Sequence, residues 1–221
     1  MRADEPDDYV RGIVLGQITA TLAVCGAFDR LDLVTREAAS LAEKMGNHYL
    51  LANAANGLAP IIHIIDPDRA GEYLLRGYEL NVENRNEHAN CTNAMFLALH
   101  EARSRNDVAA AQWARKALQL SLDNGPSYIA QTLNATVAIV RRHSPPDAAV
   151  LLGALRAHRD RKHQDGTTPE VQSEVRYEAR LRRALGAAFE ECYTHGLALD
   201  EAAMIGLAFA QLDSISGEPK A

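Results

Sequence analysis

Apolar side chains recur at every third or fourth position along almost the whole chain, which is the spacing of helices that bury one face. Glycine, proline and asparagine interrupt this pattern at intervals, and aspartates stand where new helices would begin. We therefore predict helices throughout, and we expect the side chains of Asp29, Asp68, Asp107 and Asp147 to cap four of them.

The predicted helices have definite limits near both ends of the chain. The first runs over about 7–28 and the second over about 30–45, where Gly46 ends it. Pro60 would kink or end the third helix, which opens at Asn47. Towards the carboxyl end, Thr168 caps a long helix that runs to about His195 and is followed by a last helix over about 201–213.

A set of landmarks repeats about every 40 residues. Asn53-Ala54, Asn93-Ala94 and Asn134-Ala135 follow one another at spacings of 40 and 41 residues. A period of this length, filled by two helices, is typical of an α-solenoid, in which stacked helix pairs bury faces that one pair alone would expose. The predicted fold class is therefore all-α, an α-solenoid of antiparallel helix pairs. Its parts are a helical-repeat domain of about four pairs in residues 1–163, a C-terminal capping helix pair in residues 168–213 packed on the same solenoid, and a polar tail in residues 214–221.

Composition agrees with helices and limits the function. The chain of 221 residues holds 38 alanines and 26 leucines, both strong helix formers, whereas aromatic residues make up only 5%. The formal net charge of −6 argues against a nucleic-acid or anionic-membrane binder, since such a protein would present a basic surface. Residues 141–183 nevertheless hold ten Lys or Arg against six Asp or Glu, which predicts either a solvated helix face or a docking surface for an acidic neighbour.

No motif for catalysis or for nucleotide binding occurs in the sequence. It contains no GxxxxGK[ST] phosphate loop, no GxGxxG, no GxSxG and no HExxH. His88 and Cys91 lie on one helix face, but two ligands are too few for a metal site. We therefore expect a protein that is not an enzyme and that uses no cofactor or metal. Three scattered cysteines and the lack of a stretch long enough to span a membrane predict a cytoplasmic location.

The repeat predicts one shared polar stripe. The repeated asparagines take equivalent positions on the first helix of each pair, and further polar residues lie one or two turns away. Amide side chains offer donors and acceptors to a peptide backbone or a polar ligand, and His100 and Arg141 would attract a carboxylate or another anion. Two interpretations are open: the asparagines line a concave binding groove, or they bridge one repeat to the next. The candidate groove residues are Asn53, Asn56, Asn90, Asn93, His100, Gln131, Asn134 and Arg141.

Two resemblances add to this interpretation. The helix pairs resemble a loose, 40-residue form of the tetratricopeptide repeat, without its Trp/Leu-Gly/Tyr consensus. Residues 176–213, with 147–160 before them, resemble the segment that closes the helical-repeat region of large bacterial regulators of the actinobacterial type, which join an ATPase or adenylate cyclase to a LuxR-type DNA-binding domain. The matching positions are Arg182, Leu185-Gly186, Phe189, Gly196, Leu199, Glu201-Ala202 and Leu207-Ala208.

The second resemblance implies a role in signal transduction that regulates transcription. The chain would be a non-enzymatic protein-interaction or sensor module, which binds a peptide, a small effector or a neighbouring domain of the same regulator. It would contact neither nucleic acid nor membrane directly. Because the phosphate loop, the cyclase and the helix-turn-helix are absent from the sequence, it is either a piece of a longer regulator or a free-standing version. The alternative function is a structural spacer or dimerisation scaffold with no ligand.

Overall fold

The structure is a computed structural model that describes residues 5–25, 27–47, 50, 54, 59, 68–124 and 128–217. In this part of the chain the regular secondary structure is helical throughout and includes no strand, which confirms the prediction of an all-α protein. The helix predicted from Asn47 past Pro60 falls almost entirely outside the described residues. The chain divides into two compact units, Met1–Phe96 and Leu97–Ala221.

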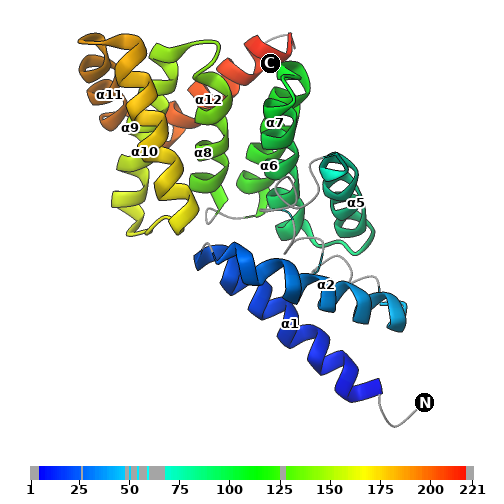
Figure 1. The fold of residues 1–221 in the computed structure, drawn as a ribbon. Coiled ribbons are helices and arrows are strands. Elements are labelled where there is room, and N and C mark those ends of the chain that lie inside the picture. Colours follow the sequence, from blue (N-terminus) through cyan, green and yellow to red (C-terminus); the bar gives the residue numbers. More distant parts are fainter. Residues whose placement is uncertain are drawn as a thin grey trace. The chain divides into compact units, whose positions relative to one another are not determined.

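In its described residues, the first unit is made of the helical segments that Figure 1 labels. Two of them, α1 and α2, pack against each other through Leu15, Ala38 and Leu41. Gly46 ends α2 in a left-handed conformation with a φ of 61°, as the sequence predicts. The bounds are α1 (Glu5–Cys25), α2 (Phe28–Met45), α5 (Ala70–Glu83) and the first part of α6 (Glu87–Arg103).

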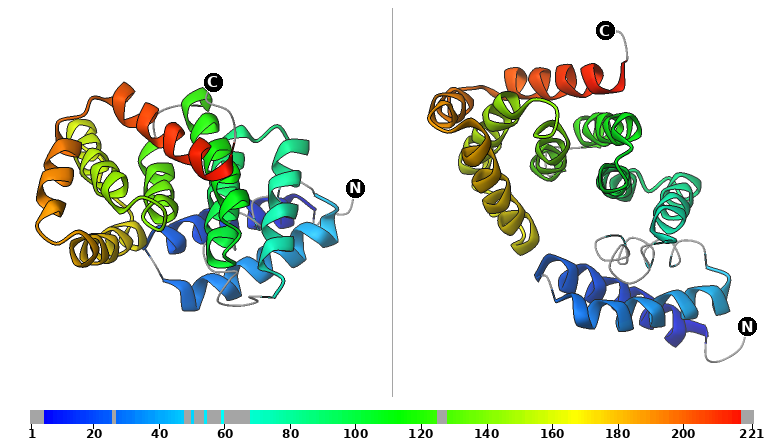
Figure 2. Two further views of the ribbon diagram at one scale, coloured as in Figure 1. Left: turned by 90° about the horizontal axis from the view of Figure 1, so that it is seen from above. Right: turned by 45° about the horizontal axis from the view of Figure 1, so that its top comes forward.

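The second unit begins within α6 and continues with α7 (Asp107–Asn124), α8 (Ile129–Val140), α9 (Pro145–Lys162), α10 (Thr168–Leu185), α11 (Ala188–Leu197) and α12 (Glu201–Ser216). Helices α7, α8 and α9 pack in chain order, as Figure 1 shows. Helix α10 contacts α8 and α9, α11 packs along α9, and α12 contacts α7, α8 and α9. Both views in Figure 2 place α10 and α12 on opposite sides of α8 and α9.

Helix α8 forms the centre of the second unit. Eleven of its 12 residues are buried, because α7, α9, α10 and α12 all contact it. Its sequence, IAQTLNATVAIV, contains no charged residue, as expected for a helix that is covered on every side. The main core cluster joins α8 to α7, α9, α10, α11 and α12, and its largest members are Leu118, Leu133, Leu151, Leu152, Leu155, Leu181, Phe189 and Met204.

The long helix predicted from Thr168 to about His195 is two helices. The chain leaves α10 at Gly186, whose φ of 57° and ψ of −128° are accessible to glycine but strained for other residues, and α11 starts two residues later. The cap of α10 is Thr167 and not Thr168. Thr167 forms a capping box with Glu170, whose Oε2 accepts a hydrogen bond from the Thr167 amide at 2.9 Å.

The aspartates that were expected to cap helices take two different positions. Asp29, Asp107 and Asp147 lie in the first turn of α2, α7 and α9, where a carboxylate still stabilises the amino end of a helix. Asp68 precedes the residue that caps α5. Asp200 does cap α12, since its Oδ1 accepts a hydrogen bond from the backbone amide three residues later at 2.8 Å. Helix α12 continues three residues beyond the predicted end.

Two glycines allow α9 and α11 to approach each other at backbone distance. A Cβ atom on Gly153 would lie 2.2 Å from the carbonyl oxygen of Tyr193, and a Cβ atom on Gly196 would lie 2.0 Å from the carbonyl oxygen of Val150. Both obstacles are backbone atoms, so the clash is relieved only if one helix moves. The α9–α11 contact therefore requires glycine at both positions.

We expect Gly153→Ala and Gly196→Ala each to lower the free energy of unfolding by about 1–3 kcal/mol, the usual cost of forcing extra volume into a packed interface. The measurement is urea denaturation followed by circular dichroism. Gly206→Ala is the matched control, because a Cβ atom there meets nothing within 4 Å. Alanine is the better helix former, so this control should be neutral or more stable by up to about 1 kcal/mol. Equal losses at all three glycines would contradict the packing described.

Candidate functional site

The structure places the eight residues of the predicted polar stripe in different surroundings. Asn53 and Asn56 lie outside the described residues. Asn90 and Asn93 are buried on the part of α6 that belongs to the first unit. The side-chain amide of Asn93 donates to the carbonyl oxygen of Ala89 one turn earlier, at 3.3 Å. Within the described part of the chain, the Oδ1 atom of Asn90 is buried and has no hydrogen-bond partner.

Asn134 connects two helices of the second unit. Its Nδ2 atom donates to Oε1 of Glu174 at 3.2 Å and to the backbone oxygen of Glu170 at 3.4 Å. Its Oδ1 atom accepts a hydrogen bond from the hydroxyl of Ser173 at 3.0 Å. Both ends of this amide are therefore used by α10, as expected if the repeated asparagines bridge one helix to the next.

Three stripe residues of the second unit are partly exposed: His100, Gln131 and Arg141. The guanidinium carbon of Arg141 lies 5.4 Å from the centre of the Tyr177 ring on α10, and its Nε atom is buried. The structure thus brings Asn134 and Arg141 together along one side of α10. That the stripe binds a ligand stays a prediction.

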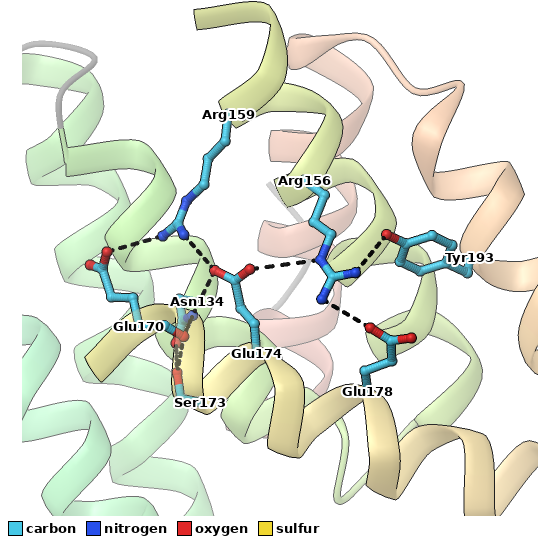
Figure 3. Close-up of polar contacts among 8 residues, drawn as sticks. All are labelled: Asn134, Arg156, Arg159, Glu170, Ser173, Glu174, Glu178 and Tyr193. Carbon is cyan, nitrogen blue, oxygen red and sulfur yellow. Dashed lines mark hydrogen bonds and ion pairs between the residues drawn. The ribbon is translucent and has the colours of Figure 1, made fainter. Parts of the chain in front are cut away.

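A network of charged residues holds α10 against α9 (Figure 3). The centre of the network is the ion pair of Arg159 and Glu174, whose atoms Nη1 and Oε1 are 2.7 Å apart, with only 8% and 7% of the side chains exposed. The second nitrogen of Arg159 contacts Oε2 of Glu170 at 3.1 Å. One guanidinium therefore satisfies two carboxylates on successive turns of α10.

Arg156 extends the network towards α11. Its Nη2 atom lies 2.9 Å from a carboxylate oxygen of Glu178, and its Nε atom lies 3.8 Å from Glu174. Its Nη1 atom donates to the hydroxyl of Tyr193 at 3.2 Å. Helices α8, α9, α10 and α11 are thereby joined by one connected set of polar contacts, drawn in Figure 3.

The Glu174 carboxyl is subject to opposing influences. Burial raises its pKa, and the charge of Arg159, the hydrogen bond from Asn134 and the charge of Arg156 lower it, with burial prevailing. Removing one member of such a buried pair typically costs about 3–5 kcal/mol, because an uncompensated charge remains inside the protein. The ion pair at the centre of the network is therefore a buried contact that holds α10, unlike an ion pair on the protein surface.

Sequence reasoning did not find this network, although signals for it are present. Glu170, Glu174 and Glu178 recur at intervals of four, which places them on one face of a helix. Arg156 and Arg159 are three residues apart on the helix before it. The two rows match in charge and in spacing, but many surface helices show the same pattern, and only burial distinguishes this pair.

His158 is a buried ionisable group beside the start of α12. Its side chain is 1% exposed, and its Nδ1 atom lies 3.5 Å from a carboxylate oxygen of Glu201. Burial lowers its pKa, Glu201 raises it, and the cations of Lys162, Arg161 and Arg159 lower it further, so that the net shift is downward. The folded protein therefore favours the neutral imidazole of His158, and protonation of this side chain lowers the free energy of unfolding.

We expect the second unit to lose stability as the pH falls below about 6.5, the ordinary histidine pKa, because the unfolded chain then takes up a proton that the folded chain resists. The free energy of unfolding should fall by up to about 1 kcal/mol per pH unit from this group. Urea denaturation at pH 7.5, 6.5 and 5.5 measures the slope. His158→Gln should flatten it, whereas His163→Asn, an exposed histidine at the left-handed end of α9, should not. The same slope in both variants would rule out His158 as its source.

The described ranges contain no group of three or more His, Cys, Asp or Glu side chains placed to hold a metal ion. No helix described combines the length and the apolar character needed to cross a membrane. The chain matches no protein-family model, no curated protein and no solved structure.

Proposed function

We propose that the chain is a helical-repeat interaction module of the tetratricopeptide-like solenoid type. The support is the spacing of its helices. The second helices of three successive pairs, α7, α9 and α11, begin at Asp107, Pro145 and Ala188, at spacings of 38 and 43 residues that lie close to the predicted period of about 40. The break at Gly186 turns the predicted capping helix into a hairpin, α10 and α11, that follows the same period as the pairs before it.

Contacts at the repeat distance favour the same arrangement. Asn134 on α8 bonds to Glu174 on α10, which is 40 residues later and therefore in the equivalent position of the next pair. Arg142 donates to the carbonyl oxygen of Ala102, again 40 residues away. Helix α8 packs on α10 as one first helix on the next, and α9 packs on α11 as one second helix on the next, which is the stacking expected of a solenoid.

The function that best fits this architecture is non-enzymatic binding of a peptide or small effector, in a module of a bacterial signal-responsive transcriptional regulator. The observation that carries the proposal is that His100, Gln131 and Arg141 stay partly exposed, while the asparagines of the stripe that the structure describes are buried. Of the stripe's described members, those three are the ones a ligand could reach. The regulator class is supported by the sequence resemblance of residues 176–213 alone.

The test is a selection of random peptides on the full chain, followed by calorimetry of the enriched peptides. We expect enriched peptides to bind the wild type and to lose at least tenfold in affinity for the double variant His100→Ala, Gln131→Ala. Both side chains are only partly buried, so the variant should keep the melting temperature of the wild type. Failure to enrich any peptide, or equal affinity for the variant, would refute the groove assignment.

A dimerisation scaffold is the second candidate, and the surface of α1 favours it. Val10, Val14 and Ile18 are 59%, 50% and 40% exposed, and their spacing of four places them on one helix face. Light scattering separates the two functions. The binding module is expected to be a monomer, whereas a dimer that Val14→Glu dissociates would establish the scaffold in its place.

A further inference from the structure

Cationic side chains gather where α6 and α8 end beside α10. Arg103 is the last residue of α6, Arg105 follows in the loop, Arg141 follows the last residue of α8, and Arg180 lies on α10 one turn after Tyr177. In the described part of the chain, none of these four arginines forms an ion pair with a carboxylate. Arg142 beside them is different, since it pairs with Asp107 and donates to a backbone oxygen.

The central member, Arg141, lies in surroundings that disfavour its charge. Its guanidinium faces the Tyr177 ring, and its buried Nε atom has no hydrogen-bond partner in the described residues. Burial lowers the pKa of Arg141, the neighbouring charge of Arg180 lowers it further, and Arg142 and Arg105 act in the same direction against the attraction of Tyr177.

Arg103 is a second arginine of this group whose surroundings disfavour its positive charge. The residue is exposed as a whole, yet partial burial lowers the pKa of its guanidinium, and the attraction of Tyr177 opposes this. Arg161, at the carboxyl end of α9, is by contrast an exposed arginine. Positive charge is therefore concentrated around Tyr177 without an acid of the described chain to neutralise it.

We infer that Arg103, Arg105, Arg141 and Arg180 form an anion-binding site around Tyr177, and that its ligand is an acidic peptide segment. An approaching carboxylate would supply the missing partner of Arg141, which no nearby group of the described chain does. The inference rests on the proposed binding function, because it names the class of ligand that the exposed end of the stripe would hold.

Three observations favour carboxylates of a peptide over a phosphate group. Helices α6 and α8 present their carboxyl ends to the site, whereas phosphate sites commonly use the free amides of a helix amino end. The amino ends of α7 and α9 carry their own acids, Asp107 and Asp147. The donors are instead guanidinium groups on separate elements, whose planar forks suit successive carboxylates along a chain.

The test is isothermal titration of the full chain with a hexaglutamate peptide at low ionic strength. The protein carries a net charge of −6 and so repels an acidic peptide in general, which makes any binding a report on a local basic site. We expect Arg141→Gln to weaken hexaglutamate binding at least tenfold. Arg180→Gln should weaken it at least threefold, and because Arg180 is exposed this variant should keep the fold. Arg161→Gln is the matched control, because it removes an equal charge at the opposite end of the α8–α9 hairpin and should leave the affinity unchanged.

Other results would overturn the inference. Absence of hexaglutamate binding, or an equal loss in the Arg141, Arg180 and Arg161 variants, would exclude a local acidic-peptide site. Inorganic pyrophosphate that binds more tightly than hexaglutamate would show that phosphate is the ligand class. If peptides selected on the chain still depend on His100 and Gln131 while hexaglutamate does not bind, the proposed binding function stands and only the anion site is wrong.

Discussion

The position of α10 depends on one buried ion pair, Arg159 with Glu174. Helix α10 is polar over much of its surface and contributes few large side chains to the core, of which Leu181 is fully buried. Its polar contacts are the hydrogen bonds of Asn134 on α8 and the ion pairs that α9 makes along three turns. Since a buried charge without a partner is costly, a shift of α10 that separated Arg159 from Glu174 would be disfavoured, and the pair thereby favours the observed position of Tyr177 on α10.

This arrangement decides how the polar stripe is used. Asn134 contributes both ends of its amide to α10, so the middle of the stripe in the second unit is an internal joint. Arg141 lies two turns later, just past the end of α8, where it faces Tyr177 and pairs with no acid among the described residues. The stripe therefore packs helices together at Asn134, whereas two turns later, at Arg141, it presents a positive charge. The proposed binding surface therefore lies at the ends of helices whose middle part holds α10.

The sequence predicted the helices well because their signals are local. Gly46 marked the end of the second helix, and the last helix was placed from about residue 201, where α12 begins. The break at Gly186 was missed because the apolar period continues through it, so that only the backbone conformation reveals the turn. The partners of Asn134 and Arg141 could not be predicted either, because they belong to α10, and a long-range contact leaves no local signal. The excess of basic residues in 141–183 left both a solvated helix face and a docking surface for an acidic neighbour open, and it did not show which arginines would be paired.

A double-mutant cycle on Arg159 and Glu174 tests the central claim most directly. Arg159→Met and Glu174→Leu would be made singly and together, and the free energy of unfolding measured by urea denaturation at pH 7.5. Each single change should cost about 3–5 kcal/mol, because it leaves one buried charge unpaired, and the double change should cost much less than their sum. A coupling energy above about 1.5 kcal/mol is the expected result. Strictly additive losses would contradict the account, since they would show that α10 is held without this ion pair.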